Sequence, residues 1–153
     1  MFKTNVENLV EHLRQDMRLA DNSLVWLHSG LVGLGLIQGG VETITEAFSR
    51  ILPKGALVIP SFTYSWCNGN VYDSSTTECP DMGGYAKDAW KDQGFVRSSN
   101  PNFAVAALSN SHNQHLIELM FSSPSDRTCF GKGSVFDRMY QFYGDPNKEF
   151  RRR

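Results

Sequence analysis

The segment from His28 to Gly40 is the part of the sequence best suited to chemistry, because five of its thirteen residues are glycine. A glycine-rich turn between a strand and a helix lets the backbone approach a phosphate, and the helix start offers free amides and a positive dipole end. The dinucleotide-binding fingerprint needs glycine at 33, 35 and 38, but position 38 is Gln38; the Walker pattern needs Lys and Ser or Thr after Gly40, but Val41 and Glu42 follow. The pattern alone leaves a phosphate-binding loop and a purely structural loop as equal interpretations.

Three histidines could act on a substrate or a metal. His28 begins the glycine-rich segment, but a hydrogen bond that orders the loop explains it better than a role as a general base. His112 and His115 are spaced i, i+3 on an expected helix, which can suit a metal, yet no carboxylate or cysteine pair completes a ligand set. We therefore expect these two on a solvated helix face and expect no metal site.

Residues between 61 and 90 could contact a ligand. Three carboxylates could attract a cationic ligand or could simply lie on a solvated loop; they are Asp73, Asp81 and Asp88. Three aromatic residues could stack on a ligand ring or cover the core; they are Tyr64, Trp66 and Trp90. The sequence does not decide between these alternatives.

The composition describes an ordinary globular chain of 153 residues, with 41% hydrophobic and 20% charged residues. The net charge is −1, and without the three final arginines the chain has 12 basic against 16 acidic residues, which argues against nucleic-acid binding. No stretch approaches the ~20 apolar residues of a membrane span, and the acidic residues near the N-terminus argue against a signal peptide. Cys67, Cys79 and Cys129 form no CxxC pair, which predicts reduced thiols in a cytoplasmic protein.

The expected elements alternate in the order helix, strand, glycine-rich loop, helix, strand, which indicates an α/β sheet. Apolar residues recur at helical spacing over 5–18, after a capping box that begins at Thr4, and again over 41–52. Short apolar runs predict buried strands at 24–27, 56–60 and 103–108. Further helices are expected near 84–90, 111–121 and 134–143, whereas 61–81 lacks periodicity and is predicted to be a functional loop.

Four segments between Leu24 and Tyr140 carry a resemblance to a known family. They read LHSGLVGLGLIQGGVETITEAF, ALVIPSFTYSW, VRSSNPNFAVAAL and CFGKGSVFDRMY. They resemble, in the same order, four motifs of the aminoglycoside 3-N-acetyltransferase family, which read roughly VHSSLSSLGxVxGGAxxVIxAL, GTLVMPTFT, RSxHPxxSFAAxG and FGxGSPLxxLY. One glycine-rich motif would be weak evidence, but four in order are specific.

The resemblance implies an α/β/α sandwich that transfers acetyl from acetyl-CoA to an amine of an aminoglycoside or amino sugar, without a metal. The loop after the first strand would hold the pantetheine and pyrophosphate of CoA, through His28, Ser29, Gly30, Leu31, Val32, Gly33, Gly39 and Gly40. Thr63 would line the same cleft, and Arg97 could pair with a CoA phosphate or orient the loop. Tyr64, Trp66 and Asp73 are weaker candidates for the sugar. The expected partner is the small-molecule aminoglycoside or amino sugar, and we expect the chain to bind neither nucleic acid nor a membrane.

The sequence departs from the family pattern at Asn100, where the motif has His, and at Ala104, where it has Ser. Such variants resemble members linked to bacterial surface-polysaccharide synthesis, which favours an amino sugar or sugar nucleotide over a clinical aminoglycoside as the acceptor. Family members are also longer, and the segment with the catalytic His has no counterpart here, so the catalytic residues stay unknown. We interpret 1–143 as the N-terminal portion of a single acetyltransferase domain, incomplete at the C-terminus, and 144–153 as a polar basic tail of the kind a frameshift would produce.

Three hypotheses about the chain stay open. It is an acetyltransferase fragment of little or no activity, a non-catalytic fragment that binds CoA or a sugar, or an inert truncated remnant without a stable fold. Loss of later strands and helices would expose apolar surface, which predicts aggregation or a homo-oligomer.

Overall fold

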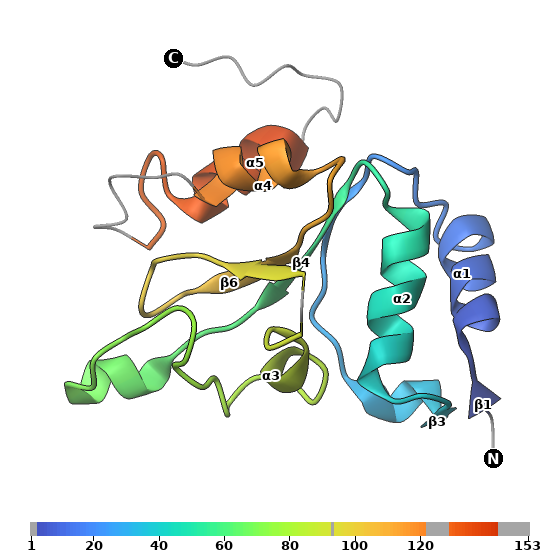
Figure 1. Ribbon diagram of the computed structural model, residues 1–153, viewed down its shortest axis with the longest axis horizontal. Helices are drawn as coiled ribbons and strands as arrows, with labels where there is room; N and C mark the ends of the chain where they lie inside the picture. Colours follow the sequence, from blue (N-terminus) through green and yellow to red (C-terminus); the bar gives the residue numbers. More distant parts are fainter. Residues whose placement is uncertain (1–2, 93, 122–128, 144–153) are drawn as a thin grey trace.

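The computed structural model describes residues 3–92, 94–121 and 129–143 (Figure 1). Its elements follow in the order β1 (Lys3–Thr4), α1 (Val6–Gln15), β2 (Leu24–Trp26), the 3-10 helix η1 (Leu31–Leu34), β3 (Leu36–Ile37), α2 (Val41–Ile51), β4 (Ala56–Pro60), the 3-10 helix η2 (Tyr64–Asn68), α3 (Ala86–Ala89), β5 (Phe95–Arg97), β6 (Val105–Leu108), α4 (Gln114–Phe121) and α5 (Val135–Tyr143).

A mixed four-stranded sheet with the order β2-β4-β6-β5 forms the centre of the fold. Strand β4 is parallel to β2, with Val25 opposite Leu57, and antiparallel to β6, which is in turn antiparallel to β5. All five residues of β4 are buried, as a continuous apolar run predicts for a strand covered on both faces. A separate pair of short parallel strands joins β1 to β3.

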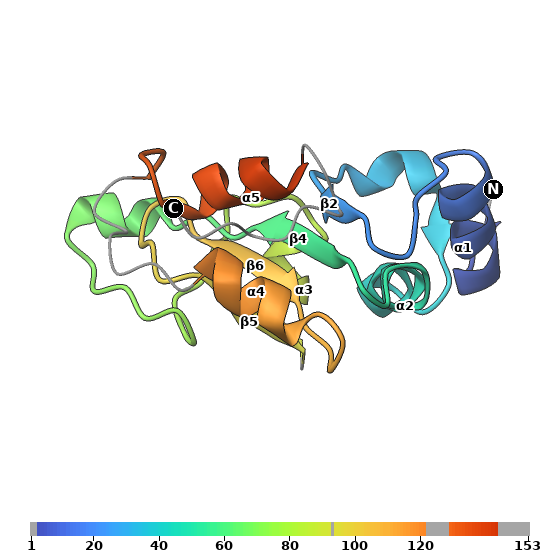
Figure 2. The same cartoon turned by 90° about the horizontal axis from the view of Figure 1, so that it is seen from above.

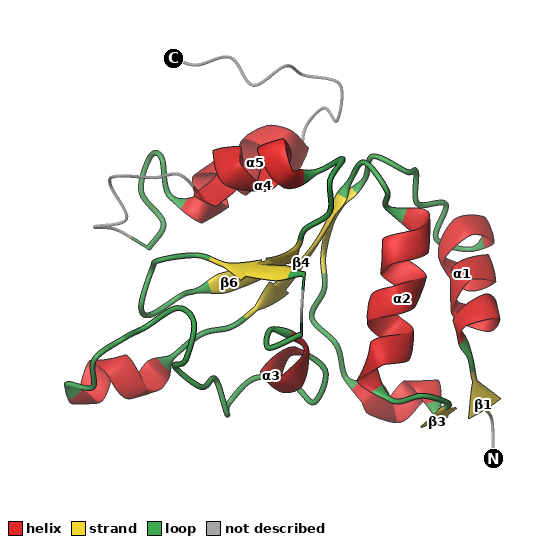
Figure 3. Ribbon diagram, viewed as in Figure 1, coloured by secondary structure: helices red, strands yellow, loops and turns green. Residues whose placement is uncertain are grey.

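Helices cover both faces of the sheet, which confirms the predicted α/β/α sandwich. Figure 3 shows α4 and α5 on one side of the strands and α3 on the other. Figure 2 shows α1 and α2 side by side, in agreement with their direct packing. No described helix is both long enough and apolar enough to cross a bilayer.

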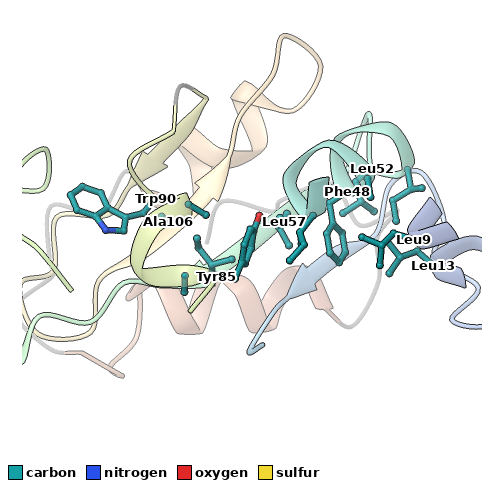
Figure 4. Packing of buried hydrophobic residues seen from close by; sticks show 14 of the residues in the cluster. Leu9, Leu13, Phe48, Leu52, Leu57, Tyr85, Trp90 and Ala106 are labelled. Atoms are coloured by element: carbon teal, nitrogen blue, oxygen red, sulfur yellow. The ribbon is translucent and has the colours of Figure 1, made fainter. Parts of the chain in front are cut away.

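Two hydrophobic clusters hold these layers together. The larger joins the apolar faces of α1, α2 and α3 to one face of the sheet, with Leu9, Phe48, Leu57 and Tyr85 among its members (Figure 4). The smaller joins α4 and α5 to the opposite face. Alternation along β4 explains the division, because Leu57 and Ile59 belong to the first cluster, whereas Ala56 and Val58 belong to the second.

Several boundaries differ from the sequence-based expectations. The capping box at Thr4 was wrong, because the Thr4 hydroxyl donates to the Leu34 carbonyl at 2.7 Å and Asn5 instead caps α1 by accepting from the Asn8 amide at 2.9 Å. The expected strand at 103–108 begins only at Val105, and the helix expected over 111–121 begins only at Gln114. Strands β1, β3 and β5 were not expected at all. The expected tail at 144–153 lies outside the described residues.

Candidate active site

A pocket of about 420 Å³ opens where the two parallel strands end. Strand β2 leads into His28, Ser29 and Gly30, and β4 leads into the segment from Pro60 to Tyr64. Both segments line the pocket, and its opposite wall comes from 81–86. Ligands of open α/β sheets bind beyond the carboxyl ends of parallel strands, which is where this pocket lies.

The side chain of Ser29 is the unsatisfied polar group of the pocket wall. Its hydroxyl oxygen is buried and has no hydrogen-bond partner among the described residues. A buried hydroxyl without a partner costs free energy, so such a group in a pocket wall marks a place where a ligand atom can complete the hydrogen bonding. The oxygen itself has almost no exposed surface, so the Ser29 side chain must turn towards the pocket before its hydroxyl can bind a ligand.

Glycines shape the two walls of the pocket in different ways. A Cβ atom on Gly83 would lie 2.7 Å from the backbone oxygen of Ser29, so the walls approach too closely for a side chain there. Gly30 has an ordinary φ of −105°, and a Cβ on it would meet nothing within 4 Å. Gly83 thus permits the close approach of the two walls, whereas Gly30 leaves the backbone open to a ligand.

The rest of the predicted glycine-rich loop folds away from this pocket. Leu31, Val32 and Gly33 lie in the 3-10 helix η1, and Val32 points into solvent with 98% of its surface exposed. Gly39 and Gly40 adopt positive φ angles of 86° and 70° and lead directly into α2. None of these five residues lines the pocket.

Thr63 is buried and does not line the pocket. Its hydroxyl donates to the carbonyl of Pro101, and its amide donates to the carbonyl of Asn102 at 3.2 Å. Its contacts in the structure thus hold the chain after β4 against the loop before β6.

Arg97 lies in β5 and anchors the long loop to the sheet. Its guanidinium donates to both the hydroxyl and the carbonyl of Ser61, at 3.0 and 2.6 Å, and to the carbonyl of Thr77 at 2.5 Å. The same group lies 4.3 Å from the ring centroid of Trp90 and 5.5 Å from that of Tyr72. Burial lowers the pKa of Arg97 from its usual value. These contacts hold the segment after β4, and not the glycine-rich loop after β2 that Arg97 was expected to orient, and Arg97 is not part of the pocket wall.

The weaker sugar candidates separate in space. Tyr64 lines the pocket, whereas Trp66 and Asp73 do not. Asp73 instead accepts from the amide and hydroxyl of Ser75 at 2.7 and 2.6 Å, which lowers the pKa of its carboxyl group. Asp81, another of the three carboxylates considered from the sequence, lies in the pocket wall.

Sequence reasoning missed most of the pocket wall outside the first loop, namely Pro60, Phe62, Met82, Gly83 and Ala86. These residues belong to segments far from His28 in the sequence, and tertiary packing brings them together. The consecutive glycines Gly83 and Gly84 were the one local signal of close backbone approach.

Asn100 replaces the motif's His in a buried position. Its side-chain oxygen accepts from the amides of Asn102 and Phe103 at 3.1 and 2.9 Å, and so fixes the turn before β6. Ala104, the other departure, is fully buried. Neither residue lines the pocket.

A second, apolar groove of about 540 Å³ adjoins the pocket. Its lining is almost entirely apolar and aromatic and comprises Leu24, Trp26, His28, Phe62, Phe103, Phe130, Phe136, Met139 and Tyr140. His28 and Phe62 line both cavities. Among the described residues, no group of three or more His, Cys, Asp or Glu side chains is placed to hold a metal ion.

The fold and the pocket define a class: an α/β/α domain with a pocket beyond the carboxyl ends of parallel strands. The sequence pattern of the aminoglycoside 3-N-acetyltransferase family matches residues 26–145, so the chain belongs to that family.

Solved structures share this fold. The apoenzyme of aminoglycoside acetyltransferase AAC(3)-IVa superposes with a TM-score of 0.73 at 21% identity, over 92% of this chain and 52% of its own. The binary complex of AAC-IIIb with CoASH superposes with a TM-score of 0.74 at 18% identity, over 91% of this chain and 56% of its own. The YokD protein from Bacillus subtilis superposes with a TM-score of 0.74 at 18% identity, over 90% of this chain and 61% of its own. The chain thus spans between half and two thirds of these proteins. No curated protein sequence matches it significantly.

Proposed function

We propose that the pocket beyond β2 and β4 binds the CoA portion of acetyl-CoA, and that the chain serves transfer of the acetyl group to an amine of an aminoglycoside or a related amino sugar. The observation that carries this proposal is the buried, unpartnered hydroxyl of Ser29 beside the open backbone of Gly30. The arms of CoA present amides and phosphates, which the Ser29 hydroxyl, once turned towards the pocket, and the open backbone at Gly30 would suit. Family membership and the CoASH complex of AAC-IIIb support the same ligand.

The reaction proposed is a direct acyl transfer. The amine nitrogen attacks the thioester carbonyl, a C–N bond forms and the C–S bond breaks. The amine loses one proton, and the departing CoA thiolate takes one up. Asp81 in the pocket wall would attract the cationic acceptor. His28 is the histidine that lines the same pocket. No residue is assigned as the base. For the acceptor, we propose more specifically a sugar nucleotide.

Calorimetric titration of the chain with CoA tests the binding step. Gly30→Val is the informative variant, because its φ suits any residue and its side chain would enter open space at the pocket wall. We expect CoA to bind the wild-type chain and to lose at least tenfold in affinity for this variant. Ser49→Val, on the exposed face of α2, is the control and should bind as the wild type does. A wild-type chain that takes up no CoA contradicts the proposal.

A turnover assay separates catalysis from binding alone. Acetyl-CoA is supplied with an aminoglycoside, an amino sugar or a sugar nucleotide, and the acetylated product is quantified by mass spectrometry. CoA binding without product favours the non-catalytic alternative, whereas product from a single acceptor class identifies the substrate.

A further inference from the structure

His28 lies at the boundary between the candidate CoA pocket and the apolar groove, and it lines both. It comes shortly after β2 and directly precedes Ser29 and Gly30, the residues proposed to contact CoA. The residue is exposed, so its imidazole can reach a molecule bound in the pocket. A histidine at this position is therefore placed to act on a bound CoA.

Ring packing holds the imidazole of His28. Its centroid lies 5.1 Å from that of Trp26 at an interplanar angle of 41°, and Trp26 in turn lies 5.4 Å from Phe136. Among the described residues, no hydrogen bond engages either ring nitrogen of His28. The loop-ordering hydrogen bond expected from the sequence is thus not found in this part of the chain, and both nitrogens can meet a ligand.

Among the described residues that line the two cavities, His28 is the one whose side chain can carry a positive charge. The other ionisable side chains are Asp81 and Tyr64 in the pocket and Tyr140 in the groove, and each of these is either neutral or negative. Histidine is the residue type that changes its charge closest to neutral pH. A negative charge that forms on a bound molecule would therefore find its partner at His28.

The surroundings of His28 favour the sulfur end of CoA over its phosphates. Trp26 packs against the imidazole, and Phe62 lines the same two cavities. Phosphates are strongly hydrated and are costly to bring beside such rings, whereas the thioester is small and uncharged. Its negative charge appears on sulfur only as the C–S bond breaks, when a positive partner stabilises it most.

We propose that His28 contacts the sulfur of CoA and stabilises the thiolate that leaves, a role that rests on the CoA site proposed above. As the C–S bond breaks, its electron pair moves to sulfur. The imidazolium of His28 pairs with this thiolate and donates a proton to it before CoA departs. The imidazole then regains a proton from the solvent, which balances the proton that the amine releases. The base that accepts the amine proton is a separate group.

Ultraviolet titration of bound CoA tests this role without requiring turnover. The thiolate absorbs in the ultraviolet, and the complex with desulfo-CoA, which lacks the sulfur, supplies the reference for the protein's own tyrosines and thiols. We expect the thiol of bound CoA to have a pKa about one unit below that of free CoA, as a neighbouring imidazolium produces. His28→Gln should restore the pKa of free CoA. His115→Gln is the matched control, because His115 is exposed on α4 and lines neither cavity.

Affinities for CoA and desulfo-CoA locate the contact. Measured where the bound thiol is ionised, His28→Gln should weaken the binding of CoA but not of desulfo-CoA, because the second ligand has no sulfur to lose. CoA that binds with an unshifted thiol pKa overturns the inference and leaves the proposed CoA site intact. Equal weakening of both ligands also overturns it, since His28 would then contact another part of CoA. A wild-type chain that binds no CoA contradicts the proposed site itself, and the inference with it.

Discussion

The backbone oxygen of Ser29 lies so close to Gly83 that a Cβ at position 83 would sit 2.7 Å from it. This approach joins the loop after β2 to the segment before α3 and brings the two walls of the pocket together. The absence of a side chain at one residue thus sets the width of the candidate CoA site.

Gly83→Ala should therefore damage the pocket. The added methyl group must displace the Ser29 backbone, at a cost of about 1–3 kcal/mol in the free energy of unfolding, and CoA affinity should fall with it. Gly84→Ala is the neighbouring control, because its Cβ would meet only the Leu31 side chain at 3.4 Å. Urea unfolding and CoA titration of both variants check the prediction. Equal behaviour of the two variants would contradict it.

Arg97→Ala should release the loop that Arg97 anchors. The variant loses three hydrogen bonds and two ring contacts, for which we expect about 2–4 kcal/mol of destabilisation. Arg97→Lys should recover only part of the loss, because an ammonium group cannot reproduce the planar fork. Limited proteolysis within 61–81 gives a local readout. The Lys91–Glu78 pair is the control, since Lys91→Ala breaks an exposed ion pair worth under ~1 kcal/mol.

Tyr85 should make the protein lose stability at alkaline pH. Burial raises the pKa of Tyr85 to about 12, above its ordinary value of 10, so the folded state binds the proton more tightly than the unfolded state does. The stabilisation is complete below pH 10 and is lost as the pH rises towards 12. Tyr85→Phe should cost about 1 kcal/mol at neutral pH, through the 2.9 Å hydrogen bond to Thr45, and should flatten the alkaline decline. Unfolding curves at pH 8, 10 and 11 compare the two proteins.

The thiols should react in a fixed order with a thiol reagent. Cys67 is exposed, whereas Cys79 is buried and burial raises its pKa to about 11. The thiolate is the reactive form, so at pH 8 we expect Cys67 to be labelled rapidly and Cys79 only after unfolding. Mass spectrometry of the labelled peptides identifies each site. Rapid labelling of Cys79 in the folded chain would show that its surroundings open readily.

Long apolar segments made much of the fold predictable. Strand β4 was predicted at its observed bounds, because five consecutive apolar residues between turn signals admit few other structures. Strand β5 was missed, since it has three residues and one of them, Val96, is exposed. The capping prediction failed because Thr4 hydrogen-bonds to Leu34, thirty positions away, which no local pattern reveals.

The residues named from the sequence reach one wall of the candidate pocket. His28, Ser29 and Gly30 followed from the motif and line the pocket, but Leu31 to Gly33 curl into a 3-10 helix that leaves it. The opposite wall depends on contacts such as that of Ser29 with Gly83, across more than fifty residues. Such contacts arise from packing of the whole domain, and a single sequence carries little local trace of them.

The position of β4 in the sheet also has a kinetic consequence. It pairs with β2 on one side and with β6 on the other. Leu57 of β4 lies opposite Val25 of β2, and Val58 of β4 lies opposite Ala107 of β6. Val58 and Ala107 lie further apart in the sequence than Val25 and Leu57 do. Because closing a longer loop costs more entropy, we expect β4 to pair with β2 before it pairs with β6. During synthesis on the ribosome, the central strand gains its second neighbour only after β6 has emerged. The sheet around β4 is therefore completed only after all the residues that line the pocket, within 28–86, have been synthesised.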